Sequence, residues 1–254
     1  MIRKLLSRID IGMRARRIFK QSLGGHGEIE LSLLSVLMRA NSLSIDIGAN
    51  KGVYTYQMKE WGRTVAFEPI PELANNLSAA AYPDLTVEQC ALCEKPGMTV
   101  LHVPYHAKKK GKLNTPSATL RDDSTSNPLG FREIHVPAKT LDSFQFEDVG
   151  FVKIDVEGWE ENVLMGGRET IRRNQPIVMA ELVETYTPGI LTRVPAFFAD
   201  LNYQGFCIDA AALKLMKIED IDPAQPVTEN YIFVPGHDAE AFRSRCQALL
   251  RQRA

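Results

Sequence analysis

The sequence predicts an α/β fold built on a mainly parallel sheet with helices on both faces. Short apolar runs that end in Asp, Glu or Pro alternate with segments of helical period, which is the pattern of repeated βαβ units. The 254 residues are 44% hydrophobic and 24% charged, as in ordinary globular proteins. No stretch approaches the roughly 18 consecutive apolar residues of a membrane-spanning helix. These observations exclude a collagen, a coiled coil and a wholly disordered chain.

Three strands and the helices between them are predicted in the first half of the chain. Residues 28–40 place Ile, Leu, Val and Met at helical spacing. Strands are predicted at 43–46, 64–68 and 85–90, and helices at 53–61 and 71–81. The second of these helices begins with Pro71, which is tolerated there because the first turn leaves its N–H groups unbonded anyway.

The second half of the chain begins with an insertion and ends with an antiparallel edge. Extended segments at 98–104 and 132–137 flank a polar, Lys-rich loop at 105–130. Further strands are predicted at 151–155, 176–182, 204–209 and 229–234, and helices at 160–173, 192–202 and 238–251. We expect the helix at 160–173 to bend at Gly166 and Gly167. About 20 residues without a clear helix join the last two strands, which favours antiparallel pairing.

Charge sets the N-terminal segment apart. The first 20 residues hold seven Lys and Arg against one Asp, although the whole chain has a net charge of −1. Apolar residues at roughly helical spacing lie among these bases, so the segment is either an amphipathic helix on an anionic membrane surface or a helix packed on its own domain. We predict a basic, amphipathic extension at 1–40 and a single domain at 41–254 with an insertion at about 98–138.

Neither secretion nor nucleic-acid binding is indicated. The N-terminus has no long apolar stretch or small-residue cleavage site, and the net charge gives no case for a nucleic-acid partner. Four scattered cysteines are too few for a disulfide framework. Cys90 and Cys93 form one C-x-x-C pair, which we interpret as packing because no second pair or His cluster completes a metal site. A cytoplasmic location is expected.

A glycine loop follows the first strand, and an acid ends the second. Asp46-Ile-Gly-Ala-Asn-Lys-Gly52 permits a tight turn and a close ligand, but Asn50 breaks the G-x-G-x-x-G pattern of dinucleotide sites. The Asp46 carboxylate favours a cationic ligand. Glu68, 22 residues further on, can accept both hydroxyls of a ribose. S-adenosylmethionine (SAM) combines a ribose, a positive centre and an amino-acid end, and therefore fits.

Ligands of open α/β sheets lie beyond the carboxyl ends of the strands, so the residues that end strands deserve most weight. These residues are Asp46, Glu68, Cys90, Asp155 and Glu181.

Three acids follow one another where the fourth core strand ends: Asp155, Glu157 and Glu160. A carboxylate or an imidazole beside an acceptor hydroxyl can take its proton during group transfer. We expect Asp155 to be this base, with Glu157 as second choice and Glu160 as a helix cap. His106 is a weaker candidate, as are His102 and His135. Clustered carboxylates can also bind Mg²⁺, but without a pair of adjacent Asp residues we predict no metal.

Three segments resemble the FkbM family of SAM-dependent methyltransferases. They are Ser44-Ile-Asp-Ile-Gly-Ala-Asn-Lys-Gly, Val65-Ala-Phe-Glu-Pro and, most specifically, Val152-Lys-Ile-Asp-Val-Glu-Gly-Trp-Glu-Glu-Asn-Val-Leu-Met-Gly-Gly. The resemblance runs from about residue 40 to about residue 185. It implies a class I methyltransferase (Rossmann-like) fold, with a seven-stranded sheet ending in an antiparallel edge strand, and O-methylation, often of sugar or polyketide hydroxyls. Where the family often has two serines in the insertion, this chain has Ser117-Ala118-Thr119.

The resemblance also assigns cofactor residues. It implies that Asp46, Gly48, Asn50 and Glu68 hold SAM and that Cys90 and Ala91 lie along its adenine. With their neighbours, the predicted cofactor-binding set is Asp46, Gly48, Ala49, Asn50, Gly52, Glu68, Pro69, Cys90, Ala91 and Asp155.

We therefore predict a SAM-dependent O-methyltransferase that acts on a small-molecule or glycan hydroxyl, with its oligomeric state left open. Two alternatives remain. A nucleotide-sugar dehydrogenase or epimerase is disfavoured by the missing G-x-G-x-x-G, and because no Lys lies four residues after Tyr54, Tyr56 or Tyr186. The other alternative is a non-catalytic protein that keeps the fold in order to bind a partner.

Overall fold

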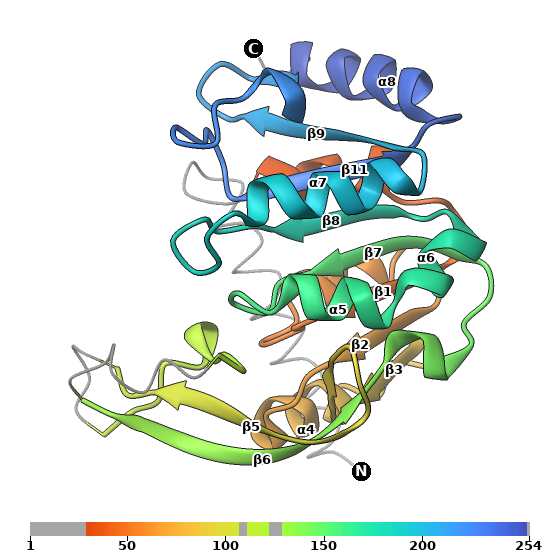
Figure 1. Cartoon of the computed structure of the whole chain (residues 1–254). Helices are drawn as coiled ribbons and strands as arrows, with labels where there is room; N and C mark the ends of the chain where they lie inside the picture. Colours follow the sequence, from red (N-terminus) through yellow and green to blue (C-terminus); the bar gives the residue numbers. More distant parts are fainter. Residues whose placement is uncertain (1–28, 107–110, 122–128, 253–254) are drawn as a thin grey trace.

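A computed structural model describes residues 29–106, 111–121 and 129–252 of the chain (Figure 1). The main sheet of these residues has eight strands in the order β10-β9-β11-β8-β7-β1-β2-β3. The strands are β1 (Leu43–Ile47), β2 (Thr64–Phe67), β3 (Leu85–Glu88), β7 (Val149–Ile154), β8 (Ile177–Glu181), β9 (Tyr203–Asp209), β10 (Lys214–Lys217) and β11 (Asn230–Pro235). The mainly parallel α/β sheet is thus confirmed.

Five neighbouring strands run parallel, and their ends meet at one edge of the sheet. In the centre, Ile45 of β1 pairs with Val65 of β2 on one side and with Val152 of β7 on the other. Strand β11 runs antiparallel to both β8 and β9, as the 20-residue connection predicts. The sheet differs from the prediction in having eight strands, because part of that connection forms β10 and pairs back on β9. The reversed strand β11 lies inside the sheet, and β10 forms its antiparallel edge.

Helices cover both faces of the sheet, as predicted. On the face nearest the viewer in Figure 1 lie α5 (Glu160–Gly166), α6 (Arg168–Asn174) and α7 (Ile190–Asp200), whose apolar side chains share one core with Ile45 and Val152. The other face packs against α2 (Leu34–Leu37), α3 (Thr55–Met58) and α8 (Ala239–Arg251). Helix α4 (Pro71–Ala79) packs through Leu77 against Ala66 of β2.

Several predicted helices are altered in detail. The helix predicted at 53–61 is only one turn long, Thr55–Met58. The helix predicted at 160–173 divides into α5 and α6 at Gly167, close to the predicted bend. Within the helix predicted at 28–40, Ile29–Leu33 is a 3-10 helix that is followed by α2, and the leucines of these two elements are buried against the sheet. The predicted basic helix falls mostly within residues 1–28, outside the described residues.

The insertion forms a second, smaller sheet. Strands β4 (Ala91–Leu92), β5 (Gly97–Pro104) and β6 (Phe131–Lys139) pair in the order β4-β6-β5, and β5 with β6 makes a long hairpin that extends to one side of the main sheet (Figure 1). Leu101, Val103 and Val136 of this hairpin pack with Ile70 and Ala91 at the end of the main sheet. The insertion therefore lies directly over the carboxyl ends of β2 and β3.

No helix in the described part of the chain is long and apolar enough to cross a membrane.

Candidate functional site

One cavity lies at the carboxyl ends of β1, β2, β7 and β8 and is covered by the insertion. The space between its walls, counting the part open to solvent, is about 780 Å³. Its lining residues are Ile47, Gly48, Asn50, Phe67, Glu68, Pro69, Ile70, Cys90, Ala91, Leu92, Leu101, Thr115, Pro116, Ala118, Leu120, Asp155, Val156, Glu157, Trp159 and Glu181. Seven of the ten predicted cofactor-binding residues belong to this set: Gly48, Asn50, Glu68, Pro69, Cys90, Ala91 and Asp155.

Glu68 is the principal polar group of the cavity floor. Its carboxylate accepts the backbone N–H of Asn50 at 2.7 Å through Oε2 and that of Ile70 at 2.8 Å through Oε1. Each oxygen therefore keeps lone pairs for a further donor. Burial raises the pKa of Glu68 to about 7, although both backbone hydrogen bonds act in the opposite direction. The arrangement presents a fixed pair of acceptors, which suits two neighbouring hydroxyl groups.

The glycine loop brings two strand ends into direct contact. Gly48 has φ +82°, and a Cβ at this position would lie 1.8 Å from the carbonyl oxygen of Asp155. Glycine is therefore required because the β1 and β7 turns touch, and, since Gly48 also lines the cavity, the close approach of a ligand stays a prediction. Asn50 has φ +50°, and within the described chain no group donates to its buried Oδ1. Because Asn50 lines the cavity, this oxygen can accept a hydrogen bond from a ligand.

Three predicted cofactor residues do not line the cavity. Asp46 is 1% exposed within β1 and accepts the hydroxyl of Thr55 at 2.5 Å. Burial raises its pKa, with Lys153 acting in the opposite direction. Ala49 uses its N–H to bond the carbonyl of Phe67 at 3.0 Å. Gly52 is enclosed, since an added Cβ would lie 2.6 Å from Leu77. These three residues support the glycine loop without lining the cavity. Their direct contact with a ligand stays a prediction.

Three carboxylates meet at the opposite end of the cavity. Each of Asp155, Glu157 and Glu181 places one oxygen within 4.8 Å of the other two. The sequence points to Asp155 and Glu157 by their adjacency. Glu181 joins them from β8, because the carboxyl ends of neighbouring parallel strands lie side by side. Of the histidines, His106 does not line the cavity; its N–H bonds the carbonyl of Lys112 within the insertion.

The three carboxylates differ strongly in proton affinity. Although burial acts to raise the pKa of Asp155, the Lys153 ammonium and a hydrogen bond from Glu181 hold it below its ordinary value. Burial, and then the charge of Asp155, raise the pKa of Glu181 well above the ordinary range. Burial, and then Asp155 and Glu160, raise the pKa of Glu157 to about 7. These shifts favour an ionised Asp155 and a protonated Glu181, and they bring proton exchange at Glu157 near neutrality.

Some features could not be seen in the sequence. Thr115, Pro116, Ala118 and Leu120 of the insertion line the cavity, and we call residues 115–121 the roof. Their only signal in the sequence is a polar segment with Pro and Thr in a long loop.

Cys90 and Cys93 are buried free thiols, and burial raises the pKa of Cys90 to about 11, so packing accounts for the C-x-x-C pair.

An open α/β sheet with an antiparallel strand among its parallel ones, and a cavity at the parallel strand ends with an acid closing β2, define the class I methyltransferase fold. Residues 46–204, more than half of the chain, match the Methyltransferase FkbM domain, so the chain belongs to the FkbM methyltransferase family. No curated protein sequence matches it.

The chain is also similar to solved structures. Methyltransferase FkbM from Methylobacillus flagellatus KT is 14% identical with a TM-score of 0.47, covering 92% of this chain and 59% of that protein. The chain thus spans less than two thirds of that relative. A precorrin-6y C5,15-methyltransferase from Geobacter metallireducens GS-15 is 14% identical with a TM-score of 0.42, covering 83% of this chain and 87% of that protein.

Proposed function

We propose that this protein transfers a methyl group from SAM to a hydroxyl group of a saccharide or glycan. The observation that carries the proposal is the pairing, in one cavity, of buried Glu68 at one end with the Asp155, Glu157 and Glu181 carboxylates at the other. The Glu68 carboxylate suits the hydroxyls of a ribose. The cluster of three carboxylates suits a cationic centre and an acceptor hydroxyl that must lose its proton.

The residues present fit SAM. Glu68 offers two oxygens to the ribose hydroxyls, Asn50 offers its unpartnered Oδ1, and Cys90 and Ala91 offer an apolar wall for the adenine. Bound SAM supplies an electrophilic methyl group on a sulfonium ion. Fixed negative charge at Asp155 favours a cation nearby, and the roof residues Ala118 and Leu120 limit access of water.

Glu157 is better suited than Asp155 to accept the acceptor's proton. A general base works best when its pKa lies near the working pH, and that of Glu157 is raised to about 7. Asp155 is engaged by Lys153, whose Nζ lies 2.7 Å from Oδ2. The order of preference inferred from the sequence is thereby reversed: Asp155 orients and balances charge, and Glu157 moves the proton.

Calorimetric titration separates this proposal from its alternatives. We expect S-adenosylhomocysteine (SAH) to bind and NAD⁺ not to bind. Binding of NAD⁺ alone would favour the dehydrogenase, and binding of neither would favour a scaffold. Transfer from methyl-tritiated SAM to a panel of mono- and oligosaccharides then tests the acceptor class, with Glu157→Gln expected to be ~10²–10⁴-fold slower.

We also propose that the protein works at the cytoplasmic face of a membrane. This rests on the net charge of +6 in residues 1–20, since each Lys or Arg near an anionic bilayer contributes about 1 kcal/mol. The full chain should float with anionic vesicles at low salt and be released at high salt. A variant with Arg14, Arg16 and Arg17 changed to Glu should stay in solution; equal flotation of both proteins would refute the proposal.

A further inference from the structure

The turn that carries Glu157 has an unusual backbone. Glu157 has φ +54° and Gly158 has φ +93°, so two successive residues are left-handed between β7 and α5. A residue with a side chain rarely adopts this region, and it persists only when the surroundings enforce it. The question is therefore which groups hold Glu157 in this conformation.

Three side chains from three different segments hold this turn. The hydroxyl of Thr119 donates to the carbonyl of Glu157 at 2.7 Å, and the hydroxyl of Thr187 donates to the carbonyl of Gly158 at 3.1 Å. From α5, Oε1 of Glu160 accepts the N–H groups of Val156 at 3.2 Å and Gly158 at 3.0 Å. Both carbonyls that the left-handed conformation turns outward are thus bonded by a threonine.

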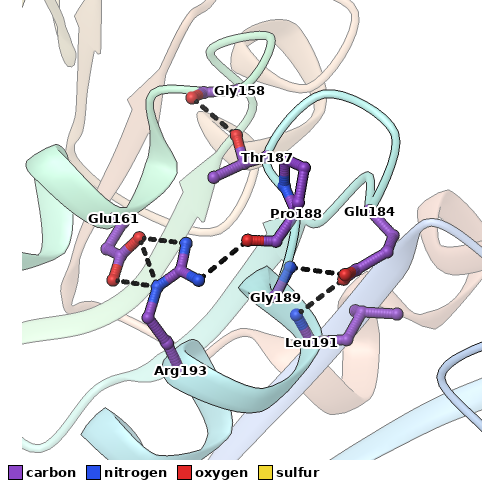
Figure 2. Close-up of polar contacts among 8 residues, drawn as sticks. All are labelled: Gly158, Glu161, Glu184, Thr187, Pro188, Gly189, Leu191 and Arg193. Carbon is purple, nitrogen blue, oxygen red and sulfur yellow. Dashed lines mark hydrogen bonds and ion pairs between the residues drawn. The ribbon is translucent and has the colours of Figure 1, made fainter.

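The loop that supplies Thr187 is itself anchored. The guanidinium of Arg193 of α7 donates to the carboxylate of Glu161 at 2.8–3.1 Å and to the carbonyl of Pro188 at 2.8 Å. Figure 2 shows these contacts side by side. Glu184 accepts the N–H groups of Gly189 and Leu191 at the start of α7. These contacts fix both ends of the loop between β8 and α7. The Thr187 hydroxyl is therefore held beside the carbonyl of Gly158.

The other threonine belongs to the roof of the cavity. Thr119 lies between Ala118 and Leu120, which line the cavity, and its backbone pairs with His102 of β5. The roof and the loop close on the turn from two sides: a Cβ on Gly158 would lie 2.6 Å from Arg121 and 3.2 Å from Tyr186. No side chain therefore fits at position 158 while both segments are in place.

We propose that Thr119 and Thr187 are positioning residues that hold Glu157 beside Asp155 and Glu181, so that covering the cavity and orienting Glu157 are one structural event. This inference rests on the proposed function, which gives Glu157 its role. A roof that lifted away would take the Thr119 hydroxyl with it and release the carboxylate from its acidic neighbours. Proton acceptance would then require the covered cavity, which excludes water from the reaction.

The test uses isosteric variants and a readout on Glu157 itself. Thr119→Val and Thr187→Val each remove one hydroxyl, Thr119→Ser keeps it, and Thr86→Val on exposed β3 is the matched control. Carbon NMR of protein labelled at the glutamate carboxyls follows Glu157, whose signal is identified by its loss in Glu157→Gln. Hydrogen exchange reports the Val156 and Gly158 amides, and SAH titration reports the cofactor site.

Both valine variants should bring the pKa of Glu157 down from about 7 towards its ordinary value, because the carboxylate becomes less buried and moves away from like charges. They should speed exchange of the two amides about two- to tenfold, the factor expected for one lost hydrogen bond. Thr119→Ser and Thr86→Val should match the wild type, and SAH affinity should stay within about twofold in all of them.

An unchanged Glu157 pKa in both valine variants, or a serine variant as altered as the valine variant, would overturn the inference. Should Thr119→Val fail to fold, Thr187→Val on the less buried loop decides the question alone. Failure of the wild type to bind SAH would count against the proposed function instead, and would leave the NMR result on the turn standing.

Discussion

The ammonium of Lys153 lies 2.7 Å from the carboxylate of Asp155, two residues further along the same chain. Lys153 is 4% exposed and lies 4.7 Å from the centre of the Tyr54 ring. A buried ammonium needs a partner of opposite charge, and Asp155 is at the same time held ionised by it. Burial, together with the negative charge that Lys153 keeps on Asp155, raises the pKa values of the two neighbouring acids, Glu157 and Glu181.

Removing the ammonium should destabilise the fold. We expect Lys153→Met to lower the free energy of unfolding by about 2 kcal/mol or more, because Asp155 and buried Asp46 lose their nearest cation. Urea unfolding measures this. Lys217→Met is the matched control, since Lys217 and Glu219 have the same spacing on the surface, where solvent screens the pair, and its loss should be much smaller. Equal losses in both variants would show that burial of the Lys153 pair adds nothing.

Glu68 should decide cofactor affinity. We expect Glu68→Ala to weaken SAH binding by about 1–3 kcal/mol, or roughly 5- to 150-fold, because charged hydrogen bonds to the ribose are lost. Glu68→Gln keeps an acceptor for one backbone N–H group and should weaken binding less. Calorimetry at pH 8, where Glu68 is mostly ionised, gives the cleanest comparison. Glu240→Ala on exposed α8 serves as control; affinity unchanged by Glu68→Ala would place the ribose elsewhere.

The raised pKa of Glu157 makes a prediction about stability and pH. Its carboxyl has a pKa of about 7 in the folded protein and 4.5 as the ordinary value, so the folded state binds the proton more tightly. The stabilisation that the protonated Glu157 carboxyl contributes is therefore fully present below pH 4.5, and it is lost as the pH rises through 7. Glu157→Gln cannot ionise, so its melting temperature relative to the wild type should rise steadily between about pH 5 and 8. A difference that stays flat over this range would show that the pKa of Glu157 is not raised.

The positions of the strand-end residues could be predicted, but the side chains that contact them from other segments could not. Glu68 and Asp155 follow apolar runs, and the carboxyl ends of parallel strands meet at one edge, so their presence in one cavity is a consequence of local pattern. Asp46 also ends such a run, but its side chain lies behind the loop because Thr55 and Lys153 are there to receive it. The direction of the Asp46 side chain depends on contacts between distant segments, which the local sequence pattern does not determine.

The roof shows the same limit of local pattern. Thr119 occupies a polar stretch of the insertion, and nothing near it in the sequence indicates a bond to a carbonyl 38 residues away. Strand β10 is similar: four residues in a connection become a strand only because β9 offers a free edge. Such features depend on tertiary packing, which overrides local preference.

The cluster of Asp155, Glu157 and Glu181 invites a test for a divalent ion. Carboxylate oxygens within 4.8 Å of one another are the ligands that Mg²⁺ prefers. Here, however, Lys153 already pairs with Asp155, and burial and the Asp155 charge favour the protonated form of Glu181. We therefore expect protons rather than a metal to balance the charge, so EDTA should change neither SAH affinity nor methyl transfer. Millimolar Mg²⁺ or Mn²⁺ should leave the melting temperature unchanged. A rise in melting temperature with Mg²⁺ that disappears in Glu181→Gln, together with activity lost in EDTA and restored by Mg²⁺, would establish the opposite: a metal that orients the acceptor at this edge of the sheet.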